Sequence, residues 1–174
     1  SSDWFRNWRF MSESGGRRIK RDLFLDQGTI RFLTAEEADR FKRFDLLRDY
    51  IGSKEAELAE ANRPIEEAHE DPVNARRLTN VGTFRAYVFN YLKSDPRINQ
   101  DMTLLVRQRE PTPDGLPIQI YCFTATTKWG EYEGIQSDIF DHILAIVPEF
   151  GLRVFQHPSG QDVREVRLGL ETPA

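Results

Sequence analysis

TLLVRQREPTPDGLPIQIYCFTAT, residues 103–126, contains two strand-like segments on either side of a turn. Residues 113–115, Pro-Asp-Gly, form that turn, because Pro fixes one backbone angle and Asp and Gly tolerate the angles that a chain reversal needs. Strands are predicted over residues 103–109 and 116–126, and together they form an antiparallel hairpin. The second strand carries bulky side chains at both alternating sets of positions. This pattern is typical of a central strand, or of one whose outer face meets a partner.

Alternating apolar residues also predict strands elsewhere in the chain. Residues 19–25 alternate with period two, and the short apolar stretch 29–33 is predicted to form a second strand after a turn at Gly28. Residues 152–155 are predicted to form a last strand. The tail from His157 onward is interrupted by Pro and Gly, so we expect it to be loose.

Helical periodicity marks three segments between these strands. Residues 34–37, Thr-Ala-Glu-Glu, are a capping box, and the apolar stripe behind them predicts a helix that ends near Gly52. A second capping signal at residues 80–83 opens a helix that ends before Pro96. The clearest amphipathic pattern predicts a helix over residues 131–147.

Residues 54–71 differ in composition from the rest of the chain. The stretch contains seven acidic residues and two basic ones, and few of its residues are apolar. We interpret this stretch as a solvated helical insertion that is broken at Pro64 and followed by a turn at Pro72.

The order of the elements is strand, helix with insertion, strand, strand, helix, strand. This β-α-β-β-α-β order is typical of the split, ferredoxin-like arrangement. The sequence therefore predicts an α+β fold with an antiparallel sheet and helices on one face.

Size and composition limit the classes of protein. A chain of 174 residues is one domain, or one domain with appendages, and the formal net charge of −4 does not mark the whole chain as a nucleic-acid binder. The single cysteine, Cys122, cannot form an internal disulfide. No run of 18 apolar residues predicts a membrane span, and no signal peptide is visible. The chain starts without Met, which suggests a fragment of a longer protein.

Catalytic and metal-binding constellations are not predicted. Asp138 and His142 lie four residues apart on one helical face, but no third ligand has a matching spacing. Cys122 lies in mid-strand, where packing is the expected role, whereas a nucleophilic Cys needs an electropositive and partly open site. We therefore expect no enzyme activity, no metal and no cofactor.

The segment NWRFMSESGGRRIKR, residues 7–21, is rich in basic residues and contains a Gly pair. It lacks the pattern of a phosphate-binding loop and precedes a strand rather than a helix. A nucleic-acid-binding arm is an alternative, because Trp4, Trp8 and Phe10 could stack on bases. The other alternative is a basic edge of the first strand, since Arg and Lys often lie there.

Four segments of the chain together resemble a known family. They are the segment 7–21, TNVGTFRAYVFNYLKSDPRI at 79–98, the hairpin region 102–124, and YEGIQSDIFDHILAIVPEFGLRVFQHPSG at 132–160. They resemble the cytoplasmic carboxyl-terminal region of mechanosensitive ion channels of the small-conductance (MscS-like) superfamily, and more closely its bacterial miniconductance subgroup. The acidic insertion departs from the small-conductance pattern, which runs directly from strand to helix.

The resemblance implies how the chain is divided and what it does. Residues 1–18 would connect to a missing upstream β domain, 19–157 would form the ferredoxin-like cytoplasmic domain with the acidic insertion at 54–75, and 158–174 would be a tail. The whole protein would be a bacterial inner-membrane channel that opens on membrane tension during hypo-osmotic shock, with this part on the cytoplasmic side.

The implied partners are identical subunits, usually seven, with ions and small solutes as permeants and the lipid bilayer contacting missing transmembrane segments. Nucleic acid is not an expected partner. The alternative is a free-standing ferredoxin-like regulatory or nucleic-acid-binding module. Gly15 and Gly16 would provide freedom at a bend, and the clustered cations could line a side opening of the vestibule and favour anions. The residues expected at subunit contacts or in the vestibule lining are Arg17, Arg18, Lys20, Arg21, Tyr121, Phe123 and Trp129.

Overall fold

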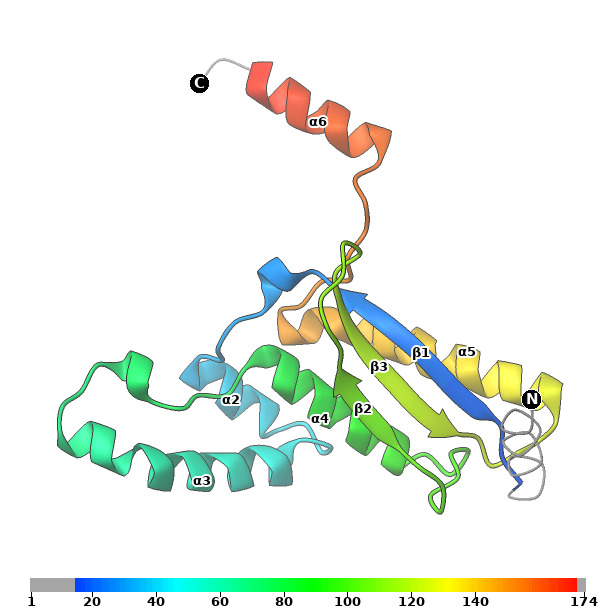
Figure 1. The fold of residues 1–174 in the computed structure, drawn as a ribbon, viewed down its shortest axis with the longest axis horizontal. Coiled ribbons are helices and arrows are strands. Elements are labelled where there is room, and N and C mark those ends of the chain that lie inside the picture. Colours follow the sequence, from blue (N-terminus) through cyan, green and yellow to red (C-terminus); the bar gives the residue numbers. More distant parts are fainter. Residues whose placement is uncertain (1–14, 172–174) are drawn as a thin grey trace.

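The computed structural model describes residues 15–171, which form a layer of strands, a layer of helices and one helix that stands apart at the C-terminal end (Figure 1). This arrangement confirms the predicted α+β class. The elements in chain order are β1 (Arg18–Leu25), η1 (Gln27–Thr29), α2 (Ala35–Phe41), α3 (Arg48–Glu67), η2 (Pro72–Asn74), α4 (Asn80–Lys93), β2 (Leu105–Gln108), β3 (Leu116–Phe123), α5 (Trp129–Ile146), η3 (Val147–Phe150) and α6 (Gly160–Glu171).

Within the described residues, three strands form one antiparallel sheet in the order β1-β3-β2. The predicted central strand is confirmed, because β3 pairs with β1 along its whole length, from Phe123 opposite Arg18 to Leu116 opposite Leu25. Gly115 closes the β2–β3 hairpin with φ +110°, a backbone conformation that other residues rarely adopt. A Cβ atom there would lie 2.6 Å from the carbonyl oxygen of Leu25, so the hairpin packs closely on the end of β1.

Two predicted strands are wrong. Residues 29–33 do not extend into a strand: Asp26 accepts a hydrogen bond from the N–H of Gly28 and starts the 3₁₀ turn η1, and Phe32 forms an isolated bridge with Thr79. Residues 152–155 are joined to β1 by a single bridge between Leu25 and Val154.

Asn80 explains why the chain between η1 and α2 follows α4 instead of the sheet. Its side chain is fully buried, and Oδ1 accepts a hydrogen bond from the N–H of Arg31 at 3.0 Å. Nδ2 donates to the carbonyl oxygens of Thr29 at 2.9 Å and Phe150 at 3.1 Å. One amide thus satisfies backbone groups of two segments that are distant in sequence, as buried polar groups require.

The capping box at residues 34–37 is confirmed, since Thr34 and Glu37 exchange both expected hydrogen bonds. The helix boundaries that follow are not as predicted. α2 ends at Phe41, and α3 runs from Arg48 to Glu67, through Gly52 and through Pro64. The non-helical residues 42–47 allow the apolar side chains on either side of them to reach the core, where Phe41 and Leu47 are fully buried. Gly52 is exposed, so packing does not oppose its helical conformation.

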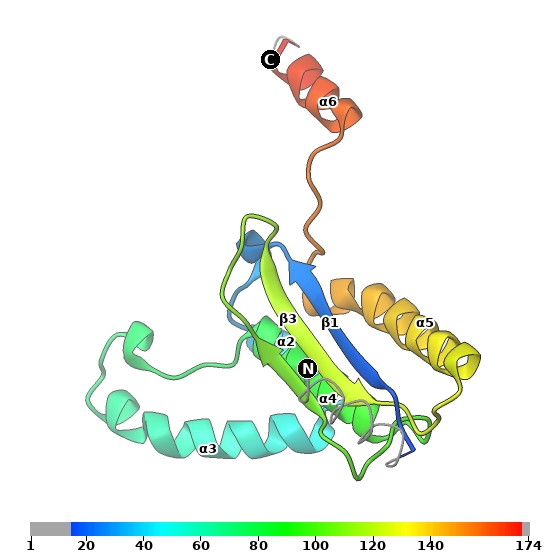
Figure 2. The same cartoon turned by 45° about the vertical axis from the view of Figure 1, so that its right-hand side comes forward.

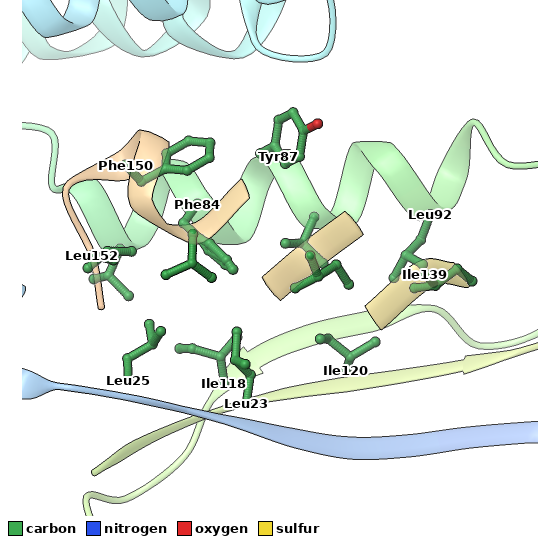
Figure 3. Close-up of a cluster of buried hydrophobic side chains, with 14 of the residues drawn as sticks. Leu23, Leu25, Phe84, Tyr87, Leu92, Ile118, Ile120, Ile139, Phe150 and Leu152 are labelled. Atoms are coloured by element: carbon green, nitrogen blue, oxygen red, sulfur yellow. The ribbon is translucent and has the colours of Figure 1, made fainter. Parts of the chain in front are cut away.

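α4 and α5 lie on the same face of the sheet, and the core lies between them and the strands (Figures 2 and 3). The helices predicted near residue 80 and over 131–147 are thus confirmed, although α5 already begins at Trp129. Phe150 is fully buried at the end of this layer. Its ring stacks on Phe41 at a centroid distance of 5.0 Å and meets the edge of Phe84 at 5.5 Å. This aromatic cluster fixes the position of α2 against α4.

The tail is not wholly loose, because α6 occupies residues 160–171. The acidic insertion predicted at 54–75 corresponds to most of α3, the following loop and η2, and α3 projects away from the sheet (Figures 1 and 2). Residues 1–14 of the predicted connector, with Trp4, Trp8 and Phe10, lie outside the described residues.

Candidate interaction surface on the open face of the sheet

The face of the sheet turned away from α4 and α5 is the candidate functional surface (Figure 2). Side chains alternate along each strand, so the pairing register assigns every strand residue to one face. We call this surface the open face. It consists of Arg18, Lys20, Asp22 and Phe24 of β1, Pro117, Gln119, Tyr121 and Phe123 of β3, Leu105 and Arg107 of β2, and Arg109. Arg109 follows β2, and its backbone N–H donates to the carbonyl oxygen of Pro117.

Four of the predicted site residues lie together at one end of the open face. Arg18 pairs with Phe123, and Lys20 pairs with Tyr121. The two aromatic rings meet edge to face at 5.7 Å, and the guanidinium of Arg18 lies 6.0 Å from the Tyr121 ring centroid. The cations are exposed at the rim of an aromatic pair, an arrangement common at protein contact surfaces.

The other three predicted site residues lie elsewhere. Arg21 is on the opposite face of β1, where its guanidinium lies 4.1 Å from the ring centroid of Phe140 in α5. Arg17 precedes β1, and its guanidinium lies 5.3 Å from the Tyr132 ring centroid. Trp129, at the start of α5, is 64% exposed. The four clustered cations of the sequence are therefore divided between two faces of the sheet.

The opposite end of the open face contains polar residues that the sequence analysis missed. Arg107 Nε donates to Gln119 Oε1 at 2.7 Å, and an Arg109 guanidinium nitrogen donates to Asp22 Oδ2 at 2.9 Å. An open cavity of about 540 Å³, near the hairpin turn, is lined by both of these arginines. Arg107 and Arg109 are two residues apart, so they lie on the same face of the sheet. The sequence could therefore have predicted their position on the open face if the register of the hairpin had been known.

The charge of the open face is predominantly positive. Arg18, Lys20, Arg107 and Arg109 contribute four cations, and Asp22 is the one carboxylate among its residues. The Arg109–Asp22 ion pair is partly exposed, so it contributes at most about 1 kcal/mol to stability. The remaining field favours an anionic or carboxylate-bearing partner.

The residues that were considered and set aside as catalytic or metal-binding groups have other partners within the fold. Cys122 is fully buried on the helix-facing side, and burial raises its pKa to about 12, so the thiol stays protonated. Asp138 binds Arg97 at 2.9 Å, whereas His142 Nε2 hydrogen-bonds the Tyr87 hydroxyl at 2.7 Å. The two side chains thus have different partners. No group of three metal-ligating side chains occurs among residues 15–171.

None of the helices within residues 15–171 has the length and apolarity needed to cross a bilayer.

The fold is thus an α+β domain whose open face combines exposed cations with an aromatic pair, of which Phe123 is buried and Tyr121 is half-buried. The comparisons identify its family: residues 58–154, more than half of the chain, match the model described as mechanosensitive ion channel MscS, C-terminal. The chain therefore belongs to the family of MscS mechanosensitive ion channel C-terminal domains. The match includes part of α3, all of α4, the β2–β3 hairpin and α5, so it contains most of the core.

A curated relative is the low conductance mechanosensitive channel YnaI of Escherichia coli strain K12. It is 39% identical over 71 residues, which are 41% of this chain and 21% of the relative. The chain thus aligns with about a fifth of that protein. The resemblance to mechanosensitive channels seen in the sequence is confirmed, and the alternative of a free-standing ferredoxin-like regulatory or nucleic-acid-binding module is not favoured.

Proposed function

We propose that this chain is the cytoplasmic vestibule domain of a mechanosensitive ion channel that opens on membrane tension during hypo-osmotic shock. The family match over residues 58–154 is the observation that carries the proposal. The longer protein would lie in a bacterial inner membrane. Residues 1–18 would connect the vestibule domain, 19–157, to an upstream β domain, and 158–174 would form its C-terminal tail.

The arrangement around β1 supports a ferredoxin-like order. The Leu25–Val154 bridge lies on the side of β1 away from β3, where a fourth strand would complete the order 4-1-3-2. Two backbone hydrogen bonds extend this contact, from Asp26 to the carbonyl of Arg153 at 2.8 Å and from Phe155 to that of Phe24 at 2.9 Å. A neighbouring subunit could lengthen this pairing.

The partners in this proposal are identical subunits, seven in the complete channel, and ions and small solutes as permeants. The open face would provide subunit contacts or line the vestibule. Leu105 is 42% exposed on this face, next to Tyr121, and these apolar groups would be buried in an assembly. Part of α3 belongs to the acidic insertion at 54–75, which would extend the contact area of each subunit.

The central experiment is electrical recording from the longer protein that contains this chain. Its upstream coding sequence should encode apolar spans of about 20 residues. In membrane patches from cells that lack other mechanosensitive channels, graded suction should open discrete currents. A complete gene product with no apolar spans, or patches that remain silent up to rupture, would contradict the proposed function.

The exposed cations allow a second, finer test. If the basic end of the open face lines a side opening of the vestibule, fixed positive charge there favours the passage of anions over cations. Replacing Arg17, Arg18, Lys20 and Arg21 together with Gln should then shift the reversal potential in a salt gradient towards cations. Arg21→Gln alone is the matched control, because Arg21 lies over Phe140 on the other face and should have no effect. An unchanged reversal potential in the fourfold variant would exclude this role.

A further inference from the structure

An open cavity of about 420 Å³ lies where α3 begins beside α4 and the edge strand β2 (Figures 1 and 2). The residues that line it come from all three elements: Tyr50 and Lys54 of α3, Gly82, Arg85, Ala86, Phe89 and Asn90 of α4, and Val106 of β2. Spacings of three and four residues place each helical set on one face of its helix. The cavity thus has a volume within the range of small-molecule sites, and it is separate from the open face.

Arg85 is half-buried in this cavity and has no anionic partner. Its Nε atom is buried without a hydrogen-bond partner, and its guanidinium forms no ion pair within residues 15–171. The side chain lies along α4 over Gly82, where an added Cβ atom would be 3.8 Å from Arg85 Nη2. A charged group that is withdrawn from water without a partner carries a desolvation penalty, and an anion in the cavity would remove that penalty.

The charge of the cavity is positive, because its described lining residues include two cations and no carboxylate. Lys54 provides the second cation, and its Nζ lies 3.4 Å from a carboxylate oxygen of Glu57. Glu57 also lies 3.7 Å from the guanidinium of Arg76, so it neutralises Lys54 only in part. Two cations favour a ligand with two negative charges. A phosphate monoester carries nearly two at neutral pH, and an Arg guanidinium can bind its oxygens through two parallel N–H groups.

The other part of the lining is apolar and aromatic. Phe89 is half-buried, so part of its ring faces the cavity, and Ala86 and Val106 lie beside it in the lining. The Nζ atom of Lys93 lies 5.8 Å from the centroid of the Phe89 ring and adds positive charge nearby. An exposed aromatic ring favours a ligand that carries a flat or apolar body in addition to its anionic group.

We propose that the cavity between α3, α4 and β2 binds a small phosphate monoester, whose phosphate group pairs with Arg85 and Lys54 and whose aromatic or apolar body lies against Phe89. The bound phosphate would join α3, most of which belongs to the acidic insertion, to α4 in the helix layer that covers the core. The residues of the site all belong to one chain, so this inference does not depend on the proposed ring of subunits.

Isothermal titration calorimetry on the 174-residue chain, at slightly alkaline pH and low salt, tests the site with three defined probes. Phenyl phosphate has the proposed charge and a ring, inorganic phosphate lacks the ring, and benzoate has a ring but a single charge. We expect phenyl phosphate to bind at least about tenfold more tightly than either of the other two, because it alone satisfies both parts of the cavity.

Variants assign the binding to named side chains. Arg85→Met keeps the apolar stem and removes the charge, so it should weaken binding of phenyl phosphate at least about tenfold. Lys54→Met should weaken it less, because Lys54 is shared with Glu57. Arg43→Met is the matched control, since Arg43 is exposed and does not line the cavity, and it should leave binding unchanged. Phe89→Leu should reduce the preference for phenyl phosphate over inorganic phosphate.

Thermal melts without ligand separate a binding role of Arg85 from a structural one. Arg85→Met should melt at or above the temperature of the unmodified chain, because it removes an unpaired and half-buried charge. A clearly lower melting temperature would show that the guanidinium already stabilises the fold, and it would overturn the proposed role.

The titrations can also refute the site. Absence of phenyl phosphate binding at millimolar concentration would overturn it, as would equal weakening by Arg85→Met and Arg43→Met, which indicates non-specific attraction. Equal binding of benzoate would indicate a carboxylate ligand, and equal binding of inorganic phosphate would exclude a contact with the Phe89 ring; either result contradicts the proposal. None of these outcomes bears on the channel function, which the suction recordings decide independently.

Discussion

Removing the Asn80 side chain should destabilise the domain more than almost any other polar truncation. Asn80→Ala deletes three hydrogen bonds in a fully buried position, to the N–H of Arg31 and to the carbonyls of Thr29 and Phe150. Each bond is worth about 0.5–1.5 kcal/mol net, and the backbone groups left without partners add a desolvation penalty. We expect the free energy of unfolding to fall by about 3–5 kcal/mol.

That loss is large because domains of this kind are stable by only about 5–15 kcal/mol. Urea unfolding, followed by circular dichroism, measures it directly, and the midpoint should fall by about 2 M at the usual dependence on denaturant. Asn90→Ala on the same helix is the matched control. Its half-buried side chain makes one bond, to the carbonyl of Leu46 at 2.8 Å, and its loss should cost about 1 kcal/mol.

The reasoning fails if Asn80→Ala unfolds within 1 kcal/mol of Asn90→Ala. The hydrogen bonds of the Asn80 amide would then contribute little to stability, and the path of residues 29–33 would need another cause.

Three further predictions concern the cap, the thiol and the glycines. The hydrogen bond from Arg31 lowers the pKa of Glu37 to about 2, so the stabilisation that the Glu37 carboxylate provides is complete above its ordinary pKa of 4.5 and is lost as pH falls towards 2. Glu37→Gln should therefore lower the free energy of unfolding by roughly 1–2 kcal/mol at pH 7, after allowance for the half-exposed Arg31. A difference in stability from the unmodified chain that stays constant between pH 7 and pH 2 would contradict this. Cys122 should resist a thiol reagent at pH 8 in the folded chain and react fully in denaturant, because burial raises its pKa to about 12; fast reaction of folded protein would show the site to be open. Gly52→Ala should raise the free energy of unfolding by about 0.5–1 kcal/mol, because Gly52 lies in an exposed part of a helix with open space for a methyl group. Gly115→Ala should lower it by more than about 1 kcal/mol, because Gly115 has a positive φ. Equal effects of the two substitutions in thermal melts would refute the conformational argument.

Local patterns predicted those parts of the fold that depend on local chemistry. The hairpin around Gly115, the capping box at Thr34 and the helices α4 and α5 all follow from residues close in sequence. The errors lie where distant contacts decide. Residues 29–33 are apolar enough for a strand, but their backbone groups bind Asn80, and no local pattern reveals that partner.

The candidate site was predictable to the same extent. Parity alone places Arg18 and Lys20 on one face and Arg21 on the other, although the clustering of the cations suggested a single surface. The contributions of Arg107 and Arg109 depend on the hairpin register, which becomes certain only when both strands are aligned.

The way the chain enters and leaves β1 has a mechanical consequence. The chain enters β1 at Arg18, and the segment that leads to α6 is tied to the far end of the same strand by the Leu25–Val154 bridge. A pull between the two ends of the domain would therefore load β1 along its axis, with the eight-residue ladder to β3 resisting in shear. The weakest element in that line is the short bridge, whose few hydrogen bonds would open one after another while the helix-covered core stayed unstretched.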